Sequence, residues 1–220
     1  MSELALYRKY RPANFKDVVG QDHVVKALQG ALKEGNAQHA YLFYGSRGTG
    51  KTSVARIFAK ELGAGEADIH EIDAATYTGV DNIRALREEA VVMPFESKVK
   101  VYIVDEVHML SKGAFNAFLK LLEEPPSHVT FILATTDLEK VPDTVQSRCQ
   151  VFTFKKPTTK AIAETVTKIA KSEGFSLEKA AGELIALLAD GSFRDSQSIL
   201  QKILSSSDRK STRLNSSHRL

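Results

Sequence analysis

The chain has 220 residues and a formal net charge of +3, a length that suffices for one large or two small domains with a buried core. The single cysteine, Cys149, excludes an internal disulfide and a cysteine-rich zinc site. No apolar run reaches membrane-spanning length and the N-terminus lacks a signal-peptide core, so we expect a cytoplasmic protein without a membrane partner.

Strand and helix patterns alternate over the first 156 residues. Strand patterns cover 40–44, 69–73, 99–104, 129–134 and 151–154, and helical patterns cover 22–33, 51–62, 81–92 and 111–123. This alternation predicts an α/β fold, in which helices cover both faces of a parallel sheet. Phe115, Phe118 and Leu122 follow helical spacing and are expected in the core.

The pattern changes after Pro157, where three helical segments follow without a strand, at 158–171, 177–189 and 194–204. We therefore expect a nucleotide-binding domain over 1–156 and a small helical domain over 157–207. Residues 208–220 carry four Arg or Lys against one Asp, which accounts for the whole net charge. This segment is polar and aperiodic, and we expect it to be disordered and foreign to the native protein.

The stretch Gly-Ser-Arg-Gly-Thr-Gly-Lys-Thr at 45–52 is the most informative in the chain. It follows the apolar run at 41–44 and opens the helical pattern that ends at Leu62, which is the context of a phosphate-binding loop. Backbone N–H groups and the start of the helix would bind phosphates, Lys51 would reach the β- and γ-phosphates, and Thr52 would ligate Mg²⁺. The expected ATP-binding residues here are Gly45, Gly48, Gly50, Lys51, Thr52 and Ser53.

Two adjacent acids, Asp105 and Glu106, follow the buried strand pattern at 99–104. A carboxylate at the end of a core strand beside a phosphate loop can hold Mg²⁺, and we assign this role to Asp105. Glu106 would orient or deprotonate the attacking water. By contrast, Glu123 and Glu124 precede two prolines and are interpreted as a solvated pair.

Several other polar residues carry no defensible chemistry in the sequence alone. His39, His108 and His128 show neither metal-ligand spacing nor a carboxylate partner. Cys149 is interpreted as a packing residue, because no histidine stands at a meaningful spacing for nucleophilic catalysis.

Further motifs extend from about Leu6 to about Leu204. They are Tyr-Arg-Lys-Tyr-Arg-Pro at 7–12, Asp-Val-Val-Gly-Gln at 17–21, Glu-Ile-Asp-Ala-Ala at 71–75, Asp-Glu-Val-His-Met-Leu at 105–110, Leu-Leu-Glu-Glu-Pro-Pro at 121–126, Ala-Thr-Thr-Asp at 134–137, Ser-Arg-Cys at 147–149 and Gly-Ser-Phe-Arg-Asp at 191–195. With these motifs the chain resembles the gamma/tau family of bacterial DNA polymerase III subunits, the clamp-loader ATPases of the AAA+ class. The Ser-Arg-Cys triplet is more specific to clamp loaders than the phosphate loop, which many folds share.

The resemblance implies an AAA+ P-loop fold with a helical lid domain, and a role for each matching residue. Thr136 would be a polar sensor of the γ-phosphate, although by itself it reads as an ordinary threonine at a strand end. Arg148, which by itself reads as a surface arginine, would be an arginine finger reaching the ATP of a neighbouring subunit. Arg194 would be a second sensor that touches the γ-phosphate in cis. Tyr7, Arg11, Val18 and Val19 would surround the adenine.

The chain departs from this family in two places. The family carries a four-cysteine zinc module where this chain has only 63–68, Gly-Ala-Gly-Glu-Ala-Asp, so we expect no zinc. The family also has a third helical domain that forms the collar of a pentamer, and this chain stops before it.

The function that the resemblance implies is an ATPase motor within the DNA polymerase III holoenzyme. It would use ATP and Mg²⁺ to open a sliding clamp and load it onto primer–template DNA, together with the other subunits of a hetero-pentamer. Contacts with the replicative polymerase and helicase would come from C-terminal regions that this chain lacks.

Three alternatives remain open at this point. A non-hydrolysing structural subunit of the loader would have no need of Lys51, Thr52, Asp105 and Glu106. Another AAA+ DNA motor, such as a branch-migration helicase, is disfavoured by the Ser-Arg-Cys triplet. A small-molecule P-loop kinase would not need the helical domain.

Overall fold

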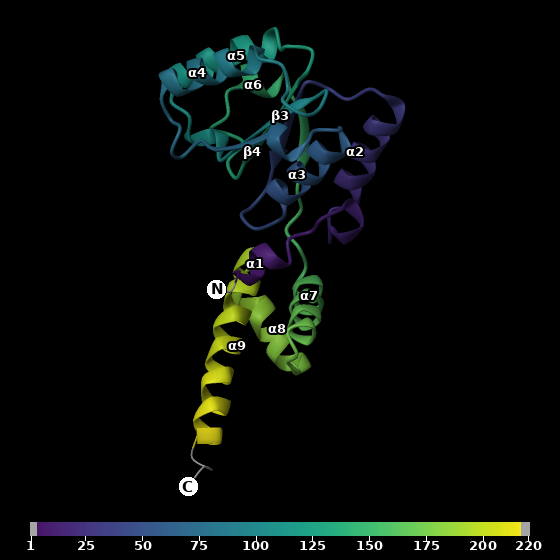
Figure 1. Ribbon diagram of the computed structural model, residues 1–220, viewed down its shortest axis with the longest axis vertical. Coiled ribbons are helices and arrows are strands. Elements are labelled where there is room, and N and C mark those ends of the chain that lie inside the picture. The colour runs from purple at the N-terminus through teal and green to yellow at the C-terminus, as the bar shows by residue number, and fades with distance from the viewer. Residues whose placement is uncertain (1–3, 217–220) are drawn as a thin grey trace. The chain divides into compact units, whose positions relative to one another are not determined.

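The computed structural model describes the backbone of residues 4–216 and the side chains of residues 4–206. Within these residues the chain divides into two compact units, and Figure 1 labels many of their elements. The sheet unit comprises Pro12–Ser46 and Gly50–Lys155. The helical unit comprises residues 4–11, 47–49 and 156–216.

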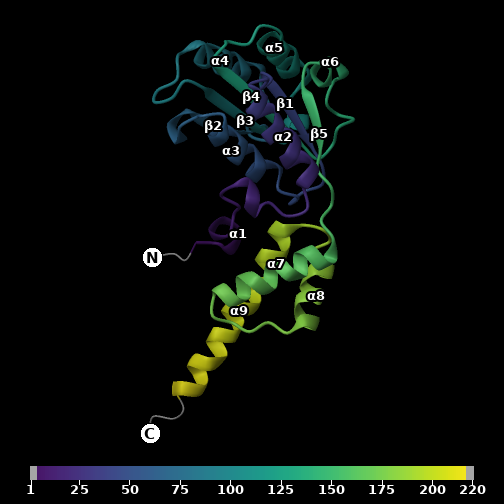
Figure 2. The same cartoon turned by 90° about the vertical axis from the view of Figure 1, so that its right-hand side faces the viewer.

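A five-stranded parallel sheet lies at the centre of the sheet unit, with strand order β2-β3-β4-β1-β5 (Figure 2). The strands are β1 Ala40–Tyr44, β2 Ile69–Asp73, β3 Lys100–Asp105, β4 Val129–Thr135 and β5 Gln150–Thr153. β3 and β4 are buried along almost their whole length, which explains their continuous apolar sequences. The predicted α/β fold with a parallel sheet is confirmed.

The carboxyl ends of the strands lie at one edge of the sheet, because all five strands run in the same direction. The register pairs Asp73 of β2 with Asp105 of β3, and Tyr44 of β1 with Thr135 of β4. The segments that follow β1, β3 and β4 therefore begin at the same edge. In open parallel sheets, ligands bind outside this edge.

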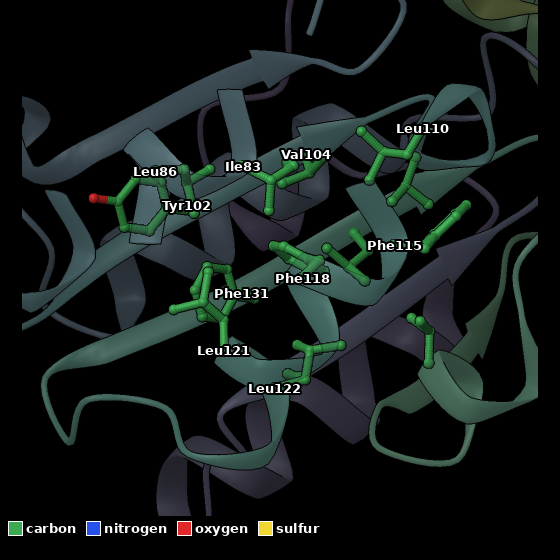
Figure 3. Close-up of a cluster of buried hydrophobic side chains, with 14 of the residues drawn as sticks. Ile83, Leu86, Tyr102, Val104, Leu110, Phe115, Phe118, Leu121, Leu122 and Phe131 are labelled. Atoms are coloured by element: carbon green, nitrogen blue, oxygen red, sulfur yellow. The ribbon is translucent and has the colours of Figure 1, made fainter. Parts of the chain in front are cut away.

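Helices cover both faces of the sheet, as Figure 2 shows. α2 Asp22–Glu34 and α3 Lys51–Glu61 pack on one face, and α4 Val80–Val91, α5 Lys112–Glu123 and α6 Asp143–Gln146 pack on the other. Short 3₁₀ turns occur at η1 Phe15–Asp17, η2 Glu66–Asp68 and η3 Val107–Met109. The second face carries aromatic packing, in which Phe118 meets Phe131 edge to face at 5.2 Å between ring centroids (Figure 3). Phe115 and Leu122 are buried in the same cluster, as the sequence predicts.

Side chains form hydrogen bonds with backbone groups that lack partners at the ends of two helices. The Ser111 hydroxyl accepts a hydrogen bond from Ala114 N at 3.2 Å and so caps α5. At the end of α4, the buried Lys100 Nζ donates to the carbonyls of Glu89 and Val92, at 3.2 and 2.9 Å. A lysine at this end also complements the helix dipole.

The short connection between α3 and β2 is closed by a buried carboxylate. Asp68 is 1% exposed. It accepts hydrogen bonds from the backbone N–H groups of Phe95, Glu96 and Ser97, and from the Ser97 hydroxyl. Burial alone raises the pKa of a carboxyl group, but these donors outweigh it and lower the pKa of Asp68 to about 2.

The helical unit consists of α7 Thr159–Ser172, α8 Lys179–Leu188, α9 Phe193–Ser216 and the short N-terminal helix α1 Leu6–Lys9. Leu6 is buried in its core, and Leu6 N donates to Gln201 Oε1 at 3.1 Å. Lys9 pairs with Glu173 at 2.7 Å. No helix of residues 4–216 is long and apolar enough to cross a membrane.

Several segments lie differently from the boundaries expected above, and among them residues 47–49 and Lys156, expected within the first domain, belong to the helical unit. Residues 4–11, expected within the first domain, pack in the helical unit, because α1 contributes Leu6 to that core. The backbone of α9 is helical as far as Ser216, although the sequence predicts a helix ending at Leu204 and disorder from 208. No glycine or proline interrupts residues 193–216, so no helix breaker ends the element at 204. The last four residues of the expected disordered tail, 217–220, lie outside the described residues.

Candidate functional site

The loop between β1 and α3 has the conformation that its glycines permit. Gly50 stands directly before α3 with φ of 99°, a left-handed conformation that favours glycine. At Gly45 a Cβ atom would lie 2.6 Å from Phe154 O, so only a residue without a side chain fits against that backbone. Thr52 and Ser53 follow in the first turn of α3.

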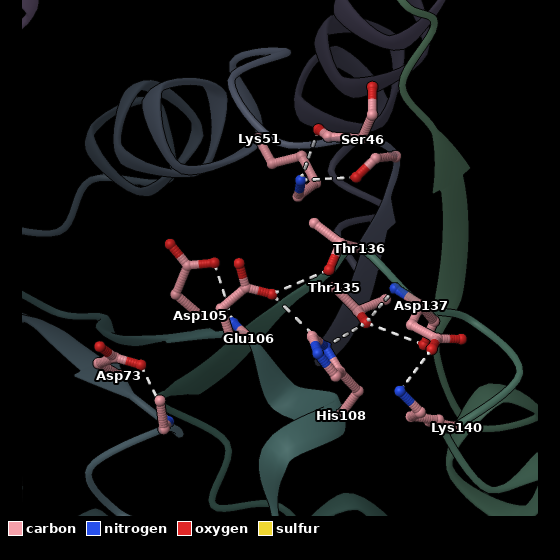
Figure 4. A network of polar contacts seen from close by, with 12 residues as sticks. Ser46, Lys51, Asp73, Asp105, Glu106, His108, Thr135, Thr136, Asp137 and Lys140 are labelled. Carbon is pink, nitrogen blue, oxygen red and sulfur yellow. Dashed lines mark hydrogen bonds and ion pairs between the residues drawn. The ribbon is translucent and has the colours of Figure 1, made fainter. Parts of the chain in front are cut away.

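Lys51 is 6% exposed and lies within the curve of this loop. Its ammonium donates to Gly45 O at 2.7 Å and to Ser46 O at 3.0 Å (Figure 4). Burial lowers the pKa of Lys51, and the carboxylates of Asp105 and Glu106 partly oppose that shift. A buried lysine that interacts with both acids is a candidate anion-binding group.

A hydrogen bond joins the start of α3 to the end of β3. Thr52 Oγ1 donates to Asp105 Oδ2 at 2.8 Å. The other carboxylate oxygen, Asp105 Oδ1, accepts from Glu106 N at 2.9 Å. Two residues that stand 53 positions apart in the sequence therefore place a hydroxyl and a carboxylate side by side.

Glu106 has a left-handed backbone with φ of 50°, which is uncommon outside glycine. Its carboxylate Oε2 accepts a hydrogen bond from Thr136 Oγ1 at 3.2 Å (Figure 4). Thr136 directly follows β4, the strand beside β3. The structure thus brings Glu106 and Thr136 together with Lys51, Thr52 and Asp105 at one edge of the sheet.

His108 is a polar residue that the sequence reading missed. The expectation that it has no carboxylate partner is wrong, because His108 Nδ1 lies 3.4 Å from Glu106 Oε2 and 3.0 Å from Thr135 Oγ1. Its side chain is only 11% exposed. The signal that could have identified it is its position two residues after Glu106, in the turn η3 that leaves the sheet.

The expected adenine-binding and second-sensor residues fall in both units. Tyr7 and Arg194 meet in the helical unit, where Arg194 Cζ lies 4.9 Å from the Tyr7 ring centroid. A hydrogen bond with Arg8 lowers the pKa of Tyr7, and Arg194 adds to this shift. Val18 is half-buried and Val19 is exposed in the sheet unit.

Two other predicted nucleotide contacts, Arg11 and Gly48, belong to the helical unit. Gly48 O accepts from Phe193 N at 3.0 Å. A Cβ atom at Gly48 would lie 2.0 Å from Ser192 Oγ, so this close packing requires glycine.

Arg148 lies just after α6 in the sheet unit. Its Nη2 donates to Glu123 Oε1 at 2.6 Å, and its Nη1 donates to Thr144 O at 2.6 Å. Glu123 is therefore the ion-pair partner of Arg148, which the interpretation as a solvated pair overlooked. Burial raises the pKa of the neighbouring Cys149 thiol to about 12, in agreement with a packing role.

Comparison with known proteins places this chain in a family. The family model described as DNA polymerase III, delta subunit, matches residues 20–76 and 64–158. The chain belongs to this family.

Relatives within the DNA polymerase III family carry the names tau and gamma. The chain is 49% identical to DNA polymerase III subunit tau of Bacillus subtilis, over 93% of this chain and 40% of the relative. It is 42% identical to subunit gamma/tau of Mycobacterium tuberculosis, over 91% of this chain and 39% of the relative. It is 43% identical to subunit tau of Escherichia coli, over 94% of this chain and 36% of the relative. The chain therefore spans about 40% of the length of these relatives.

Solved structures with the same fold include the RuvB Holliday junction branch migration motor of Thermotoga maritima. Its TM-score is 0.74 at 24% identity, and the match covers 89% of this chain and 65% of that chain. At this identity the likeness establishes the fold alone, and the fold of this DNA polymerase III family member is that of an AAA+ protein.

Proposed function

We propose that this chain is the ATP-hydrolysing motor of a clamp-loader subunit of DNA polymerase III. The observation that carries the proposal is the 2.8 Å hydrogen bond from Thr52 Oγ1 to Asp105 Oδ2, with Glu106 and Thr136 beside it. This arrangement joins a phosphate loop to a carboxylate pair in a chain whose relatives are tau and gamma subunits.

The phosphate loop binds the nucleotide in this proposal. Backbone N–H groups of Gly45, Gly48 and Gly50 and the start of α3 provide partial positive charge for the phosphates. The Lys51 ammonium, whose present partners are two neutral carbonyls, exchanges them for the stronger charge-assisted contacts of the β- and γ-phosphates. Adenine contacts come from Tyr7, Arg11, Val18 and Val19, and Ser53 supports the loop at the start of α3.

The residues present fit a magnesium ion. Mg²⁺ prefers hard oxygen ligands and is bound through one or two protein oxygens together with phosphates. The Thr52 hydroxyl and the Asp105 carboxylate provide such oxygens 2.8 Å apart. When bound, the ion would neutralise charge on the β- and γ-phosphate oxygens.

ATP hydrolysis would also require a base for the attacking water, sensors of the γ-phosphate and an arginine finger. Glu106 accepts a proton from the attacking water, and Thr136 holds the Glu106 carboxylate and senses the γ-phosphate. Arg194 would act in cis as the second sensor of the γ-phosphate. Arg148 acts in trans, on the ATP of the next subunit, where its charge stabilises the transition state.

The proposed partners are the molecules that a clamp loader would contact as it binds and hydrolyses ATP. ATP binding would order this subunit with the other subunits of the loader, and the assembly would grip the sliding clamp. Primer–template DNA would then align each Arg148 with the neighbouring site, and hydrolysis would release the clamp. Contacts with the replicative polymerase and helicase would belong to regions outside this chain.

The test is ATP turnover by the full-length protein in its assembled loader, measured with and without clamp and primed DNA. We expect turnover to rise when clamp and DNA are both present, and clamp to become topologically linked to circular primed DNA. Nucleotide binding without turnover under these conditions would favour the non-hydrolysing structural subunit. Turnover that responds to branched DNA but not to clamp would favour another AAA+ motor.

A further inference from the structure

His108 lies next to the Glu106 carboxylate, on the turn η3 that follows β3 (Figure 4). Its imidazole has two neighbours at the edge of the sheet. Nδ1 lies 3.0 Å from Thr135 Oγ1 and 3.4 Å from Glu106 Oε2. The side chain is 11% exposed, so solvent competes little for these contacts.

The hydrogen-bond pattern around Thr135 bears on the position of the imidazole proton. A threonine hydroxyl has one hydrogen to donate and two lone pairs that accept. The Thr135 hydroxyl donates to Asp137 O at 3.0 Å and accepts from Asp137 N at 3.0 Å. With its hydrogen directed to Asp137 O, the Thr135 hydroxyl has a lone pair left for His108, and this arrangement fits a hydrogen on Nδ1.

This Nδ1–H group lies between the Thr135 hydroxyl and the Glu106 carboxylate. Thr136 Oγ1 donates to the same carboxylate oxygen, Oε2, at 3.2 Å. Within residues 4–206, both side-chain contacts of the Glu106 carboxylate thus fall on Oε2. The Thr136 hydroxyl holds Oε2 by a hydrogen bond, and the His108 ring, 3.4 Å away, lies against the same oxygen, so the carboxylate has a defined orientation and Oε1 is left for the reaction.

We infer that His108 is a positioning residue for Glu106 in ATP hydrolysis. This inference rests on the proposed function, because it presumes that Glu106 acts on the attacking water. A glutamate side chain loses much conformational freedom when it is ordered. A general base must nevertheless lie within hydrogen-bond reach of its proton. His108 holds the carboxylate in place before ATP binds.

Hydrogen bonds in the segment that follows β4 hold the Thr135 hydroxyl, which in turn contacts His108. Both the N–H and the C=O of Asp137 bind the Thr135 hydroxyl, and the Asp137 carboxylate pairs with Lys140 at 2.9 Å. Asp137 therefore fixes the position of the Thr135 hydroxyl, which contacts the His108 imidazole.

The experiment compares His108→Ala and His108→Asn in the full-length protein within its assembled loader, stimulated by clamp and primed DNA. Because small misplacements of catalytic groups cost up to about 100-fold, we expect His108→Ala to lower kcat by about 10- to 100-fold. The dissociation constant of ATP should stay unchanged. The asparagine amide can replace the Nδ1–H donor, so His108→Asn should recover most of the lost turnover.

Two further variants separate positioning from a structural role. His128 also bonds through its ring, with Nε2 3.0 Å from Ala90 O, but in a different part of the sheet unit. His128→Ala should leave kcat unchanged and serves as the matched control. In a Glu106→Gln background, His108→Ala should cause no further loss in single-turnover hydrolysis, because the group that it positions is gone.

The outcomes distinguish this inference from the proposed function. If Glu106→Gln retains full turnover, the assignment of Glu106 fails, and the role of His108 fails with it. If Glu106→Gln abolishes turnover while His108→Ala retains it, only the positioning role is overturned. A His108→Ala loss that persists in the Glu106→Gln background, or that weakens ATP binding equally, also overturns it. If His108→Ala does not fold, the kcat of His108→Asn relative to His108→Gln decides the question, and equal values reject the role.

Discussion

Arg148 Nη2 lies 2.6 Å from Glu123 Oε1, while Nη1 of the same guanidinium donates to Thr144 O at 2.6 Å. The arginine proposed to act on a neighbouring subunit is therefore held within its own sheet unit. The pair is partly exposed, with 35% and 48% of the two side chains accessible. Such surface pairs contribute about 0–1 kcal/mol, so a neighbouring phosphate can replace Glu123 at little cost.

Arg148→Ala should therefore act in trans. In the assembled loader with clamp and DNA, we expect a sharp loss of hydrolysis, since trans arginine fingers contribute roughly 10³–10⁵-fold in GTPases. ATP binding should survive, because Lys51 and Arg194 remain. In the isolated chain the same change should have little effect on an already weak turnover.

A mixed assembly tests this assignment. A subunit with intact Arg148 and Lys51→Ala is placed beside one with Arg148→Ala and intact Lys51, and turnover is measured. Glu123→Gln is the matched control, because it removes the same ion pair but keeps the arginine. If Arg148→Ala disables only the site of its own subunit, or if Glu123→Gln is equally damaging, Arg148 is a surface arginine and not a finger.

Lys51→Ala should weaken nucleotide binding by at least about 10- to 100-fold. The ammonium is the cation that the phosphate loop places toward the β- and γ-phosphates, and losing a charge-assisted contact costs about 1.5–3 kcal/mol or more. Titration with a fluorescent ATP analogue measures the affinity. Lys60→Ala on the same helix removes only an exposed ion pair with Glu66 and should bind normally. Wild-type affinity in a folded Lys51→Ala protein would show that the nucleotide binds elsewhere.

Glu106→Gln should leave ATP binding intact and stop turnover. The amide keeps the shape of the side chain but cannot accept a proton from water, so kcat should fall by about 10²-fold or more. Steady-state ATPase and equilibrium binding are measured on the same preparation, with the exposed Glu124→Gln as control. Comparable hydrolysis by the Glu106→Gln variant would move the water-activating role to another residue.

Asp68→Asn should destabilise the sheet unit. The amide loses negative charge among four donors from residues 95–97, and hydrogen bonds to a charged group contribute about 1.5–3 kcal/mol. Urea unfolding at neutral pH measures the loss, with Glu61→Gln, an exposed carboxylate at the end of α3, as control. A change below about 0.5 kcal/mol would mean that the donors find water instead.

The contribution of Asp68 should also depend on pH in a defined direction. Its folded-state pKa of about 2 lies below the ordinary value of 3.8, so ionised Asp68 favours the folded state. The stabilisation is complete above the unfolded pKa and is lost as pH falls from about 4 toward about 2. The stability difference between wild type and Asp68→Asn should therefore narrow over this acidic range.

Local sequence patterns were enough to predict the sheet and the position of the glycine-rich loop between β1 and α3. Buried parallel strands are continuous apolar runs, and strand, glycine loop and helix occur together over 41–62. The structure places every predicted strand within one residue of its expected ends. These features depend only on residues that are close in the sequence, so the sequence alone is enough to predict them.

Contacts between distant segments were decided by the tertiary structure alone. Glu123 and Arg148 stand 25 residues apart, and the sequence offered no reason to pair them. His108 meets Thr135 from 27 residues away, a contact on which the inferred positioning of Glu106 depends. Leu6 lies near the N-terminus but is buried among α7 and α9. Hydrophobic burial is non-directional, so a pattern shows that a side chain will be buried but does not name the partner that covers it.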